Sequence, residues 1–277
     1  MYTNFIVIFL YFIVIYRIVQ LYEVLIAMSF QNQFTKTTTD ANLMETVHHG
    51  NAEYPFRYYY ENIALFDFKC IDWHWHSELE FIYIKSGNVV FDIGTVHFEL
   101  NEGNGIMINS KILHQLQSSS DAIIPNFLFQ PSFIAPQDSL IYKKYINPVI
   151  SSSLEYLVFQ PDIPWQKKAL EIIKTIIAVQ ETEFNREIIV SMSVQQLWIL
   201  LLENLTFDQF ENMGAVISRT RLQLMMQYVH AHYSENITLE DIARTANISK
   251  STALHLFQNN LKLTPVKYLI NYRLTQA

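Results

Sequence analysis

Short apolar segments follow one another from residue 63 to residue 129, and β-branched and aromatic residues dominate them. Turn-forming pairs and clusters separate the segments, such as Ser86-Gly87 and Gly103-Asn104-Gly105. Because no helical pattern interrupts them, this part of the chain predicts a β-sandwich or small barrel. The expected strands cover residues 63–70, 73–85, 88–93, 96–100, 105–108 and 123–129.

The spacing of apolar residues changes after Pro161 and Pro164. Residues 165–184 and 186–204 carry apolar side chains at helical intervals, so we expect two connecting helices. The second helix has a wide apolar stripe, which predicts a homodimer formed through residues 195–205. The stripe consists of Val190, Val194, Leu197, Leu201 and Leu205, flanked by Trp198 and Leu202.

The last 60 residues predict three short helices. Leu222, Met225, Met226 and Val229 give residues 221–233 an amphipathic pattern. Thr238 and Ser249 stand where N-caps are favoured, before helices at 239–246 and 250–260. Two short helices joined by a tight turn are typical of a helix-turn-helix, and an ordinary helical bundle is the alternative. The polar side of the last helix carries groups that bond phosphates or base edges, namely Lys250, Ser251, Thr252, His255, Gln258 and Asn259.

Charge is unevenly distributed along the 277 residues. The whole chain carries a formal charge of −7, but residues 218–277 contain seven Lys/Arg against three Asp/Glu. An acidic body with a basic end is typical of a sensor joined to a polyanion-binding module. The single cysteine, Cys70, excludes an internal disulfide and agrees with a cytoplasmic protein.

The N-terminal segment has two interpretations. Residues 5–16 form an unbroken apolar run, and Arg17 and Glu23 follow it. Residues 5–26 are therefore a marginal transmembrane helix, or they are not translated and the chain starts at Met28 or Met44. In both cases we expect the rest of the chain to lie in the cytoplasm. The alternative location is a membrane-tethered protein with its domains in the cytoplasm, and the membrane is a partner only if residues 5–26 insert.

One motif within the β-region contains side chains that could bind a ligand or a metal. His74, His76, Glu78 and Glu80 alternate along the chain, so a strand would point all four side chains to one face. The motif resembles the first motif of the cupin superfamily, since His74, His76, Glu80 and Gly87 have its spacing. The second cupin motif is partial: His114 can be placed, but Ile108-Asn109-Ser110 stands where Pro-x-Gly is expected.

Three imidazoles and a carboxylate suit Zn, Fe, Mn or Ni. A metal-dependent cupin enzyme acting through His74, His76, Glu80 and His114 is therefore the alternative function. We favour an effector pocket without a cofactor, in which Glu78 or Glu80 bonds the ring nitrogens. A metal at this site is the less favoured interpretation.

The C-terminal stretch resembles the AraC family of bacterial transcription regulators. The similar residues are Ile237 to Ala243, Ile248 to Ser251, Leu256-Phe257, Leu263-Thr264-Pro265, Tyr268-Leu269 and Tyr272-Arg273-Leu274, with Ala277 after them. Trp73-His74-Trp75-His76 and Leu79-Glu80-Phe81 also resemble the cupin-like domain that usually accompanies this unit. The resemblance implies effector sensing by the cupin domain and sequence-specific DNA binding without catalysis. By similarity, Ser251, Leu254 and His255 contact bases, and Lys250 and Gln258 lie nearer the phosphates.

The sequence also departs from the family pattern. His255 stands where the family usually has Arg, and the chain ends at Ala277, inside the helix that leads to a second helix-turn-helix. Fewer phosphate contacts predict weak, salt-sensitive DNA binding. A truncated fragment that does not bind DNA is therefore a further alternative.

These observations predict an α+β protein with four parts. They are an apolar leader (1–43), a cupin-like barrel or sandwich (44–135), connecting and dimerisation helices with a linker (136–217), and an all-α helix-turn-helix unit without its second motif (218–277). The expected partners are DNA, an unidentified small-molecule effector, a second copy of the chain and RNA polymerase.

Overall fold

The computed structural model describes residues 36–40, 43–94, 96–181, 184–205, 213–261 and 263–275. The apolar run at residues 5–26 lies outside these ranges, and the predictions about the membrane lie there with it. Among the described residues, no helix has the length and apolar character required for a membrane span.

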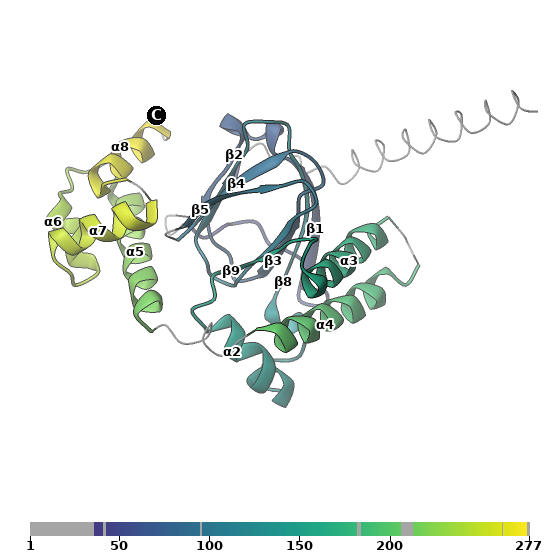
Figure 1. Ribbon diagram of the computed structural model, residues 1–277. Coiled ribbons are helices and arrows are strands. Elements are labelled where there is room, and N and C mark those ends of the chain that lie inside the picture. The colour runs from purple at the N-terminus through teal and green to yellow at the C-terminus, as the bar shows by residue number, and fades with distance from the viewer. Residues whose placement is uncertain are drawn as a thin grey trace, which may run out of the picture.

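Two antiparallel sheets form the N-terminal body, which we call the barrel (Figure 1). One sheet has the strand order β1-β8-β3-β6-β9, and the other has the order β2-β7-β4-β5. The expected β-sandwich or barrel is confirmed. The strands are β1 (Phe56–Asn62), β2 (Cys70–His74), β3 (Leu79–Tyr83), β4 (Asn88–Ile93), β5 (Val96–Asn101), β6 (Gly105–Ile108), β7 (His114–Gln117), β8 (Ile123–Phe129) and β9 (Tyr156–Phe159).

Several strand boundaries differ from the prediction. The expected strand at 63–70 is wrong, because the chain makes two 3-10 turns there, Ile63–Leu65 and Asp67–Lys69. The Asn62 side chain accepts a hydrogen bond from the Ala64 amide and so starts the first turn. Strand β9, beyond the expected end of the sensor at residue 135, pairs with β6 and completes the larger sheet.

Alternation along β3 separates two apolar layers. Leu79 and Phe81 point out of the barrel, while Ile82 joins the residues packed between the two sheets. Both layers are well buried, since the exposed fraction of each of these side chains is 1% or less. Glu80 lies between Leu79 and Phe81, so its carboxylate points into the barrel interior.

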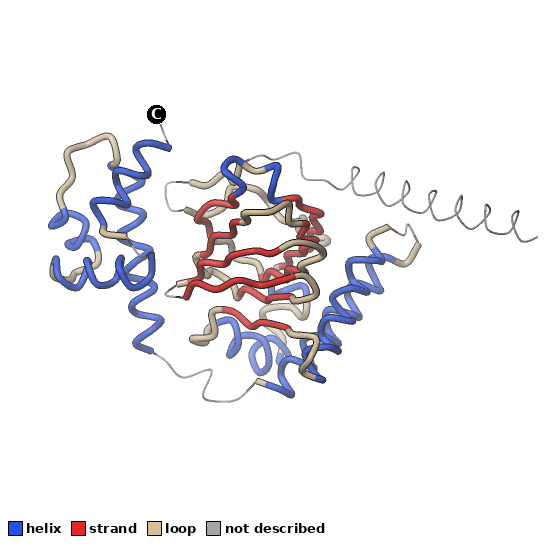
Figure 2. Tube along the Cα trace, turned by 45° about the horizontal axis from the view of Figure 1, so that its top comes forward, coloured by secondary structure: helices blue, strands red, loops and turns tan. Residues whose placement is uncertain are grey.

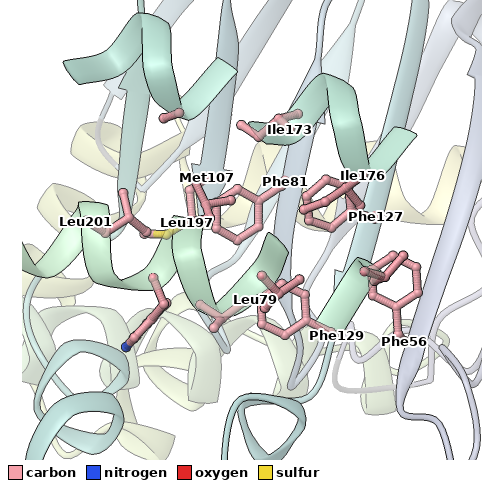
Figure 3. Close-up of a cluster of buried hydrophobic side chains, with 14 of the residues drawn as sticks. Phe56, Leu79, Phe81, Met107, Phe127, Phe129, Ile173, Ile176, Leu197 and Leu201 are labelled. Atoms are coloured by element: carbon pink, nitrogen blue, oxygen red, sulfur yellow. The ribbon is translucent and has the colours of Figure 1, made fainter. Parts of the chain in front are cut away.

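Helices α3 (Pro164–Val179) and α4 (Arg186–Asn204) cover the outer face of the larger sheet, and the short α2 (Asn147–Ile150) lies beside them (Figures 1 and 2). Leu197 and Leu201 of α4 pack there against α3 and the aromatic side chains of the sheet (Figure 3). The predicted dimer contact through this stripe is therefore wrong: the chain's own core covers it. The apolar side chains that α4 exposes are instead Ile188, Met192 and Ile199.

The C-terminal helices form a separate group beside the barrel, which we call the helical unit (Figure 2). Thr238 and Asp241 form a reciprocal capping box before α6, and the Ser249 hydroxyl accepts from the Thr252 amide at the start of α7. Arg273 donates to the carbonyls of Tyr233 and Glu235 and so ties the last helix to the first. The helices are α5 (Met213–His232), α6 (Leu239–Thr245), α7 (Lys250–Leu261) and α8 (Pro265–Thr275).

The helical unit packs against the barrel. Leu43 and Leu113 of the barrel side belong to the same buried cluster as Met225 and Val229 of α5. The Gln223 side chain donates a hydrogen bond to the Lys111 carbonyl across the same junction, at 3.2 Å. The two bodies therefore share an apolar interface.

Candidate functional site

Three histidines lie together inside the barrel, and we call them the histidine cluster: His74, His76 and His114. His74 ends β2 and pairs directly with His114 at the start of β7. His76 follows in the connection to β3. All three are buried, with exposed fractions of 5%, 3% and 0%. The folded chain thus brings together the three histidines that the sequence motif selected.

Backbone hydrogen bonds orient each ring of the histidine cluster. The Nδ1 atoms of His74, His76 and His114 lie 2.8, 3.2 and 2.9 Å from the carbonyl oxygens of Asp72, Glu78 and Ile112. A carbonyl oxygen only accepts, so each Nδ1 carries the proton and donates it. In a neutral ring, the Nε2 atom is then left as the free acceptor or metal ligand.

Glu80 extends into the cluster from β3. Its Oε2 lies 3.3 Å from His76 Nε2 and 3.2 Å from His114 Nε2. Despite this short distance, Nε2 of His114 makes no hydrogen bond within the described residues. The cavity beside these groups holds about 40 Å³ and is lined by His74, Glu80, Glu45, His49 and Asn126 among others. It has room for an ion or a water molecule.

The same contacts set the charges of the cluster. Burial lowers the pKa of His74 to about 3, and the neighbouring His114 adds to this effect, so His74 is neutral. Burial opposes ionisation of Glu80, but its contacts with His114 and His76 outweigh this and hold its pKa well below the usual range. Burial also opposes protonation of His76, but its hydrogen bond to Glu80 dominates and raises the His76 pKa.

Glu78 does not join the cluster, although the alternating pattern predicted that it would. Its carboxylate contacts the Gln130 amide and the Ser77 hydroxyl, and it lies 3.9 Å from Nδ1 of His76, on the far side of that ring from Glu80. The prediction failed because β2 ends at His74 and β3 begins at Leu79. The two-residue period holds only within a strand, and residues 75–78 lie between strands.

Sequence reasoning missed a second layer around the cluster. The His49 Nε2 atom lies 3.0 Å from Glu45 Oε2, and its Nδ1 lies 2.9 Å from the Tyr59 hydroxyl. The His49 ring is 5.7 Å from the ring of His76. Glu45 and His49 precede the first strand in a segment without periodicity, so no sequence signal marked them.

The histidine cluster is chemically suited to a divalent transition metal. The ligand atoms of His74, His76 and His114 all lie within 4.8 Å of one another. Two donors on one ion at about 2.1 Å each are at most about 4.2 Å apart, so only small side-chain movements are needed. Histidines that bind a metal typically donate from Nδ1 to a backbone carbonyl, and here an ionised carboxylate also lies beside the Nε2 atoms.

The predicted DNA-facing helix is α7. Lys250, Ser251, His255 and Gln258 are exposed, while Thr252 and Leu254 are partly buried. The opposite side, Ala253 and Phe257, is fully buried in the helical unit. Lys250 Nζ lies 3.2 Å from Glu240 Oε2, so an exposed acidic partner accompanies this cation.

Strand β2 connects the two sites. His74 points into the barrel, whereas its neighbour Trp73 and the nearby Trp75 pack against the buried cluster shared with the helical unit. Trp75 also accepts a backbone hydrogen bond from Glu45, which places the residue 43–49 segment over this strand. His74, which faces the barrel cavity, therefore lies directly between two tryptophans that face the helical unit.

Comparison with known proteins identifies the sensor region. Residues 66–136 match the model of the AraC-like ligand binding domain. The uncharacterized HTH-type transcriptional regulator YdeC of Bacillus subtilis is 32% identical over 245 residues, which are 86% of this chain and 82% of that protein. The lactose operon transcription activator of Staphylococcus xylosus is 24% identical over 155 residues, 54% of this chain and 55% of the relative.

One solved structure of a transcriptional activator is similar to this chain at low identity. The AraC-like transcriptional activator CuxR is 15% identical, and the match covers 72% of this chain and 67% of that chain with a TM-score of 0.34. The extent and identity of the match to the Bacillus regulator, together with the matching ligand-binding domain, decide the assignment. The chain belongs to the AraC family of transcriptional regulators.

Proposed function

We propose that this regulator binds promoter DNA through the exposed polar face of α7 and that ligand occupancy of the sensor changes that binding. One observation carries the proposal: α7 buries Ala253 and Phe257 in the helical unit while Lys250, His255 and Gln258 stay exposed, although the unit rests on the barrel. A helix-turn-helix reads DNA with this part of its second helix.

The side chains of α7 have different proposed roles. Ser251, Leu254 and His255 contact base edges, and Lys250 and Gln258 bond phosphates, with Thr252 beside them. His255 makes a weaker guanine contact than an arginine would, because it lacks a permanently charged bidentate donor. Lys250 must also leave Glu240 when it reaches a phosphate. We therefore expect weak, salt-sensitive DNA binding.

Fluorescence anisotropy with the DNA upstream of the chain's own reading frame tests this surface. The double variant Lys250→Ala, His255→Ala should weaken binding by about tenfold or more and reduce the salt slope by about one. Lys168→Ala, an exposed lysine on α3, is the matched control and should bind as the unmodified chain does. Equal binding by the double variant and the control would contradict the assignment.

We further propose regulation in place of cupin catalysis, in line with the family to which the chain belongs. Neither the effector nor the direction of regulation enters this proposal. Cytoplasmic location and contact with RNA polymerase stay predictions.

A second proposal concerns the histidine cluster: it binds one divalent metal ion through His74, His76 and His114, with Glu80 as the fourth ligand. The closeness of the ligand atoms of the three histidines and the unsatisfied Nε2 atom of His114 favour it. A bound metal would supply a positive charge that neutralises Glu80. This chain's residues would orient the ligands through their Nδ1 bonds and release the His76 proton on binding.

Elemental analysis of the chain purified without chelator tests the metal. We expect one divalent ion per chain, reduced well below that in His76→Ala. His97→Ala is the matched control, since His97 is exposed on β5, bonds Asp92 and does not belong to the histidine cluster. Absence of stoichiometric metal in the unmodified chain, before and after incubation with Zn²⁺ or Mn²⁺, would refute this proposal.

The homodimer stays a prediction, and its expected surface moves to the outer side of α4. Ile188, Met192 and Ile199 are exposed by 60%, 66% and 57%, at intervals that place them near one helix face. Ile188→Lys, Ile199→Lys should make a dimer dissociate in sedimentation velocity without loss of folding. A dimer unaffected by these changes would exclude this face.

A further inference from the structure

Of the three residues in the histidine cluster, His76 lies outside a strand. His74 ends β2 and His114 begins β7, so the sheet fixes the backbone of both. His76 lies in the connection between β2 and β3, residues 75–78. A ligand on such a connection keeps one position only if neighbouring segments hold the connection in place. The contacts of residues 76–78 therefore decide where the His76 ring lies.

The turn between β6 and β7 holds this connection. The Lys111 amide donates a hydrogen bond to the His76 carbonyl at 2.8 Å. The Ser110 hydroxyl donates to the Ser77 carbonyl at 2.7 Å, and Ser110 is only 8% exposed. Two consecutive residues of the turn thus bind two consecutive carbonyls of the connection.

Asn109 anchors the turn to the rest of the barrel. It is 1% exposed, and its side-chain nitrogen donates to the carbonyls of Val149 and Leu154 at 3.0 and 2.8 Å. Its Oδ1 accepts from the Ser110 amide at 2.8 Å, and its backbone amide donates to the Glu155 carbonyl. Because the nitrogen and the oxygen of this side chain are both bonded, the backbone that carries the Ser110 hydroxyl has little freedom to move.

Gln130, directly after β8, also holds the connection. Its side-chain nitrogen donates to the Ser77 hydroxyl at 2.8 Å and to the Glu78 carboxylate. The Glu78 carbonyl in turn accepts from Nδ1 of His76 at 3.2 Å. Gln130 therefore fixes the residue whose backbone orients the His76 ring.

These contacts give a role to the departure from the second cupin motif. Ile108-Asn109-Ser110 stands where Pro-x-Gly is expected, so Ser110 occupies the place of the glycine. Glycine has no side chain that donates a hydrogen bond, and it could not bind the Ser77 carbonyl as the Ser110 hydroxyl does. Ser110 therefore supplies a contact to the His76 connection that the expected motif lacks.

We propose that Ser110 and Gln130 are positioning residues for His76. They hold residues 76–78 so that Nε2 of His76 faces Glu80, whose Oε2 lies 3.3 Å away, and the ligand atoms of the other two histidines. When either side chain is lost, the connection keeps fewer contacts with the barrel and the ring samples more positions. The positioning does not depend on the proposed function, whereas its effect on metal affinity rests on the metal site proposed above.

Nuclear magnetic resonance of the chelator-treated full chain tests the positioning without a metal. The Nδ1 proton of His76, which is bonded to the Glu78 carbonyl, should give a slowly exchanging signal in the unmodified chain. Ser110→Ala and Gln130→Leu should each speed this exchange by about tenfold, because each frees the connection. Ser110→Thr keeps the hydroxyl and should exchange as the unmodified chain does.

Ser118→Ala is the matched control. Ser118 is 6% exposed, and its hydroxyl donates to the Asn88 carbonyl at 2.7 Å, so this variant loses a hydrogen bond of the same kind within the same barrel. Ser118 follows β7 at the end away from His114 and should leave the His76 signal unchanged. Equal exchange in Ser110→Ala and Ser118→Ala would overturn the proposal, as would unchanged exchange in Ser110→Ala.

Titration with Co²⁺, followed by the visible absorption of the bound ion, measures the consequence for metal binding. Ser110→Ala and Gln130→Leu should bind Co²⁺ about 10- to 100-fold more weakly than the unmodified chain, whereas Ser110→Thr and Ser118→Ala should bind it equally well. Unchanged affinity in Ser110→Ala would contradict the positioning role. If the unmodified chain binds no Co²⁺, the metal proposal fails, and the exchange of the His76 proton still decides whether Ser110 and Gln130 position the ring.

Discussion

The barrel interior and the interdomain cavity, which lies between the barrel and the helical unit, are lined by different kinds of side chain. In the barrel, the histidine cluster and Glu80 are almost fully buried, bonded to the backbone or to each other, and leave about 40 Å³. In the interdomain cavity, about 570 Å³ is bounded by aromatic rings, amides and hydroxyls from two bodies. The first arrangement suits a small ion held by fixed donors, and the second suits an organic molecule.

The difference also affects stability. Groups in the barrel interior come from β2, β7 and the β2–β3 connection and from β3 of the other sheet, so their loss disturbs the packing between the two sheets. Groups on the interdomain wall belong to two bodies that meet at an apolar cluster and a hydrogen bond, so their loss changes the junction more than either body. Three substitutions or conditions separate these behaviours.

The largest effect is expected at Glu80. Glu80→Gln in chelator-treated protein should lower the free energy of unfolding by about 3–5 kcal/mol, because it removes the charge that balances buried His76 and leaves poorly matched donors at His76 and His114. Urea denaturation measures the loss. Glu102→Gln, at an exposed glutamate, is the control and should change stability by less than about 0.5 kcal/mol. Similar values for the two variants would mean that the cluster is not a balanced buried network.

An intermediate effect is expected from acid at His230, a buried residue of α5 beside the interdomain cavity. Its folded pKa of about 4 lies below the unfolded value near 6.5, so the unfolded chain binds more protons between these values. The stabilisation is complete above about pH 6.5 and is lost as the pH falls toward 4, by up to about 3 kcal/mol. As the pH is lowered through this range, the free energy of unfolding should fall less steeply for His230→Phe than for the unmodified chain. Parallel curves would show that His230 does not carry this dependence.

The smallest effects are expected for two asparagines, one beside the barrel cavity and one on the wall of the interdomain cavity. Asn126 is 1% exposed beside the barrel cavity and donates to Glu61 and to the Ile124 carbonyl. Asn126→Ala should cost about 1–2 kcal/mol of unfolding free energy. Asn271→Ala, at the exposed interdomain wall, should cost less than about 0.5 kcal/mol. Thermal denaturation compares the pair, and a larger loss at Asn271 would reverse the contrast.

Local chemistry explains which features the sequence predicted. The α6 and α7 boundaries followed from Thr238, Asp241 and Ser249, because caps act within a few residues. The histidine cluster followed from a short spacing and one strand pairing, His74 with His114. The predicted α+β fold of a cupin-like barrel followed by a helical part is confirmed, as is the AraC-family resemblance.

Features that depend on packing between distant segments were missed. The α4 stripe predicted a partner but did not say whether the partner was a second chain or the chain's own sheet. Glu45 and His49 reach the cluster from an irregular segment, which has no period to detect. The interdomain cavity joins side chains that lie more than 100 residues apart in sequence, and its walls carry no local pattern.

Strand β2 gives the two regions a common support. His74 helps to form the ion-sized cavity, and Trp73 before it and Trp75 after it pack against the helical unit. Trp73 and His74 point to opposite faces because they are neighbours within β2, and Trp75 lies just past the end of the strand. A rotation of this strand about its own axis must displace both sets of side chains together. A ligand that displaced His74 would therefore also displace, through the adjoining backbone, the two tryptophans against which the helical unit packs.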